Sequence, residues 1–80
     1  MVYVQTAYER LQAALADARR EAKLTQADVA RVLARPQSFV SKYETGERRL
    51  DVVEFLEVCE AVRTDPVGVL KIVSGARLGK

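Results

Sequence analysis

The chain has 80 residues, of which 49% are apolar, enough for one small hydrophobic core. It contains no histidine and one cysteine, Cys59, so the usual metal ligand and general base is absent and an internal disulfide is excluded. No apolar run approaches the roughly 18 residues of a membrane helix, and the N-terminus lacks the layout of a signal peptide. We therefore expect a cytoplasmic protein that binds no metal and no cofactor, with Cys59 packed as a small apolar residue.

The first helix is indicated by a capping signal and a periodic stripe. Thr6 and Glu9 have the spacing of a capping box, in which each side chain bonds the backbone of the other residue. The apolar stripe that follows has helical spacing and contains Tyr8, Leu11, Leu15, Ala18 and Ala22.

Two short helices joined by a tight turn are predicted next. Thr25 suits the cap of a helix that opens at Gln26, and Asp28 completes a capping box. Pro36 cannot continue that helix but suits the start of the following one. Gly46 suits the end of that second short helix, because glycine readily adopts a left-handed backbone.

Two further helices complete the prediction. Asp51 and Glu54 form a third capping box, which opens a fourth helix. Asp65 followed by Pro66 is typical of a cap and a first helical position, so a fifth helix begins there. Residues 74–80 contain two glycines and two basic residues, and we expect a flexible basic tail.

Charge is unevenly distributed, although the net charge is only +2. Residues 30–50 carry five basic and two acidic side chains, whereas residues 51–65 carry five acidic and one basic. The positive segment covers the second short helix and the loop after it, as phosphate binding requires. With 30% charged residues overall, an ordinary solvated surface is the alternative, and charge alone does not separate the two.

The pair of short helices contains Gln26 at the start of the first, Ala30 where the two cross, Val40 and Tyr43 in the second, and Glu44-Thr45-Gly46 after it. On these residues the pair resembles the helix-turn-helix of the phage repressor and Cro family, which includes bacterial regulators of the xenobiotic-response-element type. The resemblance extends over about residues 6–73. It implies an all-α, five-helix, lambda-repressor-like domain over residues 1–73, with the helix-turn-helix at about residues 25–46, that binds double-stranded DNA.

Two further positions bear on this resemblance. Arg19 stands where the family carries an arginine that pairs with the glutamate found here as Glu44, so the resemblance implies a structural ion pair. Ala34 stands at the turn position where the family usually has glycine. If the backbone there is left-handed, alanine costs about 1 kcal/mol of stability.

The second short helix carries the candidate base contacts. Gln37 and Ser38 lie in its first turn, the part that enters the major groove in this motif, and glutamine can pair with adenine. Lys42 has either guanine or a phosphate as its partner, and Ser41 is a further candidate. Phe39 either contacts a thymine methyl group or leans on the preceding helix.

Backbone phosphates are assigned to other side chains. The resemblance implies that Gln26 and the amides at its helix start form a phosphate clamp, with simple helix propensity as the alternative for Gln26. Arg35, Arg48 and Arg49 are expected to contact phosphates through charge, or else to be solvated surface groups.

The fourth and fifth helices have more apolar side chains than one core can cover, which predicts an exposed patch in a monomer. The simplest arrangement that covers the patch is a two-fold homodimer through the fifth helix. The expected interface residues are Val67, Val69, Leu70, Ile72 and Val73.

The sequence therefore predicts a transcriptional regulator, with repression of a pseudo-palindromic operator as the leading function. Restriction–modification controllers and antitoxins of similar length are alternatives of the same kind. A second class is a protein-interaction adaptor on the same fold, as in coactivator bridging factors. An enzyme is disfavoured because there is no phosphate-binding glycine loop and no base for Cys59. No small-molecule effector domain is visible.

Overall fold

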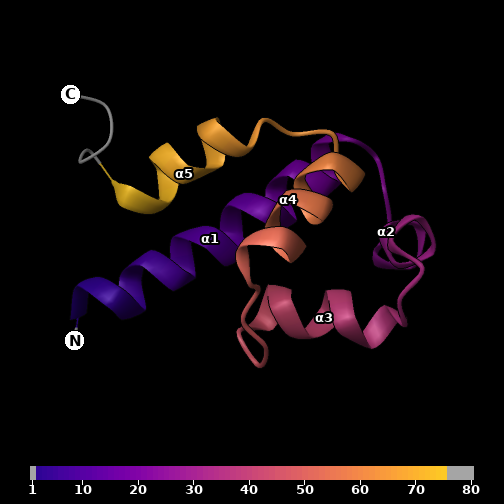
Figure 1. The fold of residues 1–80 in the computed structure, drawn as a ribbon, viewed down its shortest axis with the longest axis horizontal. Coiled ribbons are helices and arrows are strands. Elements are labelled where there is room, and N and C mark those ends of the chain that lie inside the picture. The colour runs from indigo at the N-terminus through magenta and orange to yellow at the C-terminus, as the bar shows by residue number, and fades with distance from the viewer. Residues whose placement is uncertain (1, 76–80) are drawn as a thin grey trace.

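The computed structural model describes residues 2–75, with side chains from residue 6 onward, and this part of the chain is all helical with short connections. Figure 1 shows α1 crossing the molecule with α5 beside it, while α2 and α3 lie at the end away from both termini. The predicted all-α, five-helix fold is confirmed. The helices are α1 (Val2–Glu21), α2 (Gln26–Leu33), α3 (Gln37–Thr45), α4 (Val52–Ala61) and α5 (Pro66–Ser74).

The start of α1 differs from the prediction. The helix begins at Val2, so Thr6 lies about one turn inside it and does not open it with Glu9. No proline or glycine lies between Val2 and Thr6, and nothing in the chain therefore stops the helix from extending by this extra turn.

The capping boxes of α2 and α4 are confirmed. The N–H of Asp28 donates to Thr25 Oγ1 at 3.0 Å, and the N–H of Thr25 donates to Asp28 Oδ2 at 2.8 Å. The same reciprocal bonds join Asp51 and Glu54 at 2.7 and 3.1 Å. Each pair satisfies amide groups that the first turn of a helix leaves without partners.

Both ends of α5 follow from local sequence. The Asp65 side chain accepts hydrogen bonds from two backbone amides, and Pro66 is the first residue of the helix, as predicted. The helix includes Ser74 and ends at Gly75. The predicted flexible tail therefore does not begin at Ser74, and the rest of it, residues 76–80, lies outside the described residues.

All five helices contribute to the hydrophobic core. Cys59 lies in it, as expected, and burial raises the pKa of its thiol to about 11. The thiol is therefore neutral and packs as an apolar group. The core residues are Leu15, Val29, Ala30, Phe39, Val40, Tyr43, Phe55, Val58, Cys59, Ala61, Val62 and Val69.

The turn between α2 and α3 carries the strain that the sequence suggested. Ala34 has φ 56° and ψ 42°, a left-handed conformation in which its Cβ crowds the backbone. Its N–H is directed at the carbonyl oxygens of Ala30 and Arg31 and so closes α2. Pro36, with φ −62°, then directs the chain into α3.

Replacing Ala34 by glycine should raise the free energy of unfolding by up to about 1 kcal/mol, because glycine adopts this conformation without a Cβ clash. The greater freedom of glycine in the unfolded chain offsets part of the gain. The control is Ala13→Gly at an exposed position inside α1, which should lower stability by about 1 kcal/mol. Urea denaturation measures both changes. Equal losses in the two variants would show that the turn is unstrained.

Candidate nucleic-acid interface

The packing of α3 determines which of its side chains reach solvent. Val40 and Tyr43 are buried, as predicted. Gln37 and Ser38 are exposed in the first turn. Lys42 is exposed further along the same helix, and Ser41 beside it is partly buried. The polar side chains predicted to read bases thus lie on the outer side of α3, with those of the first turn fully available to a ligand.

Phe39 belongs to the core. Only 8% of its surface is exposed, and its ring meets that of Tyr43 edge-on at a centroid distance of 5.5 Å. The guanidinium carbons of Arg35 and Arg48 lie 4.5 and 4.8 Å from the Phe39 centroid. Of the two alternatives for Phe39, the contact to a thymine methyl group is therefore corrected: little of the ring is left for a base, and packing is the role that the structure shows, with two arginines against the ring.

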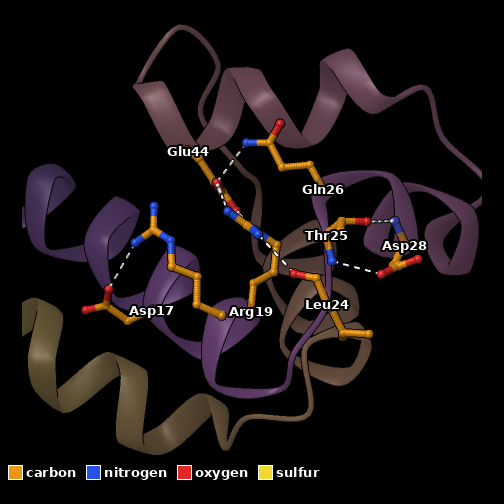
Figure 2. A network of polar contacts seen from close by, with 8 residues as sticks. Asp17, Arg19, Leu24, Thr25, Gln26, Asp28 and Glu44 are labelled. Carbon is orange, nitrogen blue, oxygen red and sulfur yellow. Dashed lines mark hydrogen bonds and ion pairs between the residues drawn. The ribbon is translucent and has the colours of Figure 1, made fainter.

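A buried ion pair joins α1 to the end of α3, as the resemblance implied. Arg19 Nε and Nη2 donate to the two carboxylate oxygens of Glu44 at 2.8 and 3.1 Å. The two side chains are only 11% and 6% exposed. Arg19 Nη1 also donates to the carbonyl of Leu24 at 3.0 Å, so the loop before α2 is held by the same side chain. Figure 2 shows Arg19 and Gln26 both directed at Glu44.

Gln26 takes part in this network. Its Nε2 donates to Glu44 Oε1 at 3.0 Å, which joins the first residue of α2 to α3. The sequence offered a phosphate clamp or simple helix propensity for this residue, and neither interpretation includes the contact. One amide hydrogen of Gln26 is used for Glu44, which fixes the orientation of its side chain.

The basic loop after α3 is bound to α4 through Glu54. Arg48 Nη1 and Nη2 donate to Glu54 Oε1 and Oε2, each at 2.9 Å, and Arg35 Nη2 reaches Oε2 at 3.4 Å. The hydrogen bonds from Arg48, followed by that from the Asp51 amide, lower the pKa of Glu54 to about 2. The carboxylate is therefore ionised throughout the neutral range. The sequence pattern indicated only a capping role for Glu54, although its place just after a basic loop is a signal for such pairing.

Two cations near α3 have no acidic partner. Over the described part of residues 35–49, Lys42 and Arg49 are the basic side chains that form no ion pair with a carboxylate. Arg49 lies over the ring of Tyr8 at 4.1 Å, a contact that orients the guanidinium without neutralising it. Lys42 and Arg49 are therefore the basic side chains of this segment whose charge no carboxylate neutralises, and they can bind a phosphate without breaking an ion pair.

Arg10 has a role that sequence reasoning missed. Its Nη2 donates to the carbonyl of Val73 at 2.7 Å, and its Nε lies 3.0 Å from the carbonyl oxygen of Ile72. These carbonyls belong to the last turn of α5, where helix geometry leaves acceptors unsatisfied. The partners are more than 60 residues apart in sequence, so no local pattern could indicate the contact.

The residues predicted for the dimer interface do not share one face. Val69 is only 4% exposed and belongs to the core, and Val73 is partly buried against it. Their assignment to an outer surface is therefore corrected. The exposed apolar residues of α5 are Val67, Leu70 and Ile72.

This arrangement is that of a helix-turn-helix domain: α2 and α3 pack across a tight turn, and the first turn of α3 is polar and exposed. The chain belongs to the helix-turn-helix domain family, which matches residues 10–70, and is therefore a DNA-binding regulator by family. The predicted resemblance is confirmed. Among the described residues, no helix is long and apolar enough to cross a membrane.

Solved structures that are similar to this chain include two bacterial proteins. One is an XRE-family like protein from Pseudomonas syringae pv. tomato str. DC3000, with 44% identity, a TM-score of 0.84, and coverage of 91% of this chain and 89% of that one. The other is the clp gene regulator ClgR from C. glutamicum, with 23% identity, a TM-score of 0.78, and coverage of 92% and 96%. The second likeness shows the fold alone. No curated protein is significantly similar to the chain.

Replacing Arg19 by methionine should lower the free energy of unfolding by about 3 kcal/mol, because Glu44 is then left buried without its cation. The loss falls at the low end for such pairs because Gln26 still donates to Glu44. The matched control is Arg20→Met, which removes an exposed pair with Asp17 and should cost less than about 1 kcal/mol. Chemical denaturation compares the two, and equal costs would mean that the buried pair contributes no more than an exposed one.

Proposed function

We propose that the protein is a homodimeric repressor that reads a pseudo-palindromic DNA operator through α3. The observation that carries this proposal is the exposure of Gln37 and Ser38 in the first turn of a helix whose other side is anchored in the core. In this motif that turn enters the major groove, and a glutamine there can accept and donate to adenine at the same time.

The cations around α3 support the same orientation. Lys42 and Arg49 carry positive charge without an acidic partner among the described residues, and both follow the polar turn in the chain. We assign both to backbone phosphates, which position the protein on the duplex without reading its sequence. Arg35 and Arg48 both lie against the ring of Phe39, and we assign them weaker phosphate contacts.

The exposed apolar residues of α5 support a homodimer. Val67, Leu70 and Ile72 are each about half exposed, and contact with a second copy of the chain would remove apolar surface from water. A two-fold contact centred on Ile72 would cover part of this apolar surface and set two copies of α3 on half-sites about 34 Å apart. Restriction–modification controllers and antitoxins would use the same surface, whereas an adaptor would select no DNA site.

Binding sites selected from a random duplex pool should show a palindromic consensus for the wild-type protein. Gln37→Ala should weaken binding to that consensus by about 1–3 kcal/mol, the value of one bidentate base contact, while affinity for unrelated duplexes changes little. Fluorescence anisotropy with both duplexes measures the two affinities. Equal weakening would identify Gln37 as a phosphate contact, and a pool without enrichment would favour the adaptor.

Ile72→Asp should stay folded and become monomeric. Ile72 is 52% exposed, so a monomer tolerates the charge, whereas a symmetric interface would have to desolvate it twice. Affinity for a full operator should then fall far more than affinity for a single half-site.

The control for Ile72→Asp is Val32→Asp, an equally drastic change at an exposed apolar residue of α2, which should remain dimeric. Sedimentation velocity at tens of micromolar reports the state of all three proteins. Monomeric wild-type protein, or a dimeric Ile72→Asp variant, would place the interface elsewhere or remove it.

A further inference from the structure

Glu54 is the point where the basic loop, the α2–α3 turn and α4 meet. Its side chain is 12% exposed and receives four hydrogen bonds. One comes from the Asp51 amide and completes the capping box. The other three come from the guanidinium groups of Arg48 and Arg35. Capping therefore accounts for one hydrogen bond, and the remaining three hold two arginines that the proposed function places on the DNA side.

These hydrogen bonds neutralise positive charge beside the reading helix. Arg48 is bound through both terminal nitrogens at 2.9 Å, the geometry in which a phosphate would also bind it. A phosphate must therefore replace the carboxylate or share the guanidinium with it. In either case the negative charge of Glu54 lies close to the incoming phosphate and opposes it.

From this geometry we infer that Glu54 restrains non-specific DNA binding: its carboxylate competes with backbone phosphates for Arg48 and Arg35. The inference rests on the proposed function, since it requires these arginines to face DNA. Non-specific binding comes almost entirely from phosphate neutralisation and counterion release, whereas operator binding also draws on base contacts. A carboxylate that occupies these guanidinium groups thus lowers the affinity for non-specific DNA more than the affinity for the operator. The ratio of operator to non-specific affinity therefore rises.

The carboxylate acts as a constant feature of the site and not as a pH switch. Its lowered pKa leaves it charged at any pH at which the protein meets DNA. The arginines are also held by Phe39, on which both guanidinium groups lie, so loss of the carboxylate leaves them packed but with their charge free.

Salt dependence of binding to a non-specific duplex tests this inference, with Glu54→Gln as the principal variant. Glutamine keeps the shape of the side chain but removes its charge. The slope of log affinity against log salt concentration should steepen by about 0.9 for each additional phosphate that the variant binds. If the variant binds one more phosphate, its affinity should fall about 3.5 times more than that of the wild type between 50 and 200 mM salt.

Glu57→Gln is the matched control, because it makes the same charge change about one turn further along α4. Glu57 is exposed, and its carboxylate pairs with no cation among the described residues. The slope for this variant should equal that of the wild type. Circular dichroism verifies that both variants are folded.

A second comparison keeps the inference testable if Glu54→Gln does not fold. Arg49→Gln should flatten the non-specific slope by about 0.9, whereas Arg48→Gln should flatten it much less, because Glu54 already neutralises most of that charge. Where Glu54→Gln does fold, adding Arg48→Gln to it should remove the added slope.

Several results would overturn the inference. Equal slopes for Glu54→Gln and Glu57→Gln, or equal flattening by Arg48→Gln and Arg49→Gln, would do so while leaving the proposed function intact. Wild-type protein that binds no duplex would overturn both.

Discussion

The orientation of α3 depends on the buried pair of Arg19 and Glu44. A buried ion pair need not add net stability, because desolvation opposes the Coulomb attraction and apolar residues of similar volume can be equally stable. What this pair adds is a fixed orientation of α3 relative to α1 and α2. Arg19 has donors for Glu44 on α3 and for the Leu24 carbonyl before α2, and Gln26 joins them from the start of α2. Three segments therefore keep one relative geometry, and the polar first turn of α3 is presented from a rigid base.

Charge near α3 is less available than its residue count suggests. Of the five basic side chains in residues 30–50, Arg31 pairs with Asp28 within α2, and Arg35 and Arg48 share Glu54. Acidic groups thus moderate three of the five cations. A surface of this kind attracts DNA less strongly in general, so that selectivity depends more on base contacts than on the summed charge.

The parts of the fold that could be predicted are those encoded within a few residues. The caps at Thr25, Asp51 and Asp65 followed from side chains that bond amides two or three positions away. The sequence left packing and a base contact open for Phe39, and the two arginines that lie against its ring could not be predicted, because they come from two separate connections. Apolar periodicity likewise indicated that α5 has a core side but did not distinguish Val69 from its neighbours.

The position of α5 does not depend on its exposed side chains, because Arg10 holds the helix by its backbone. Arg10 binds backbone carbonyls of the last turn, and Val69 packs inward. Neither interaction uses the side chains of Val67, Leu70 or Ile72, which point to solvent. Because α5 is held by its backbone and its inner face, the outer residues can change without moving α1. The hydrogen bonds that hold α5 and those that orient α3 thus use different side chains of α1, Arg10 and Arg19.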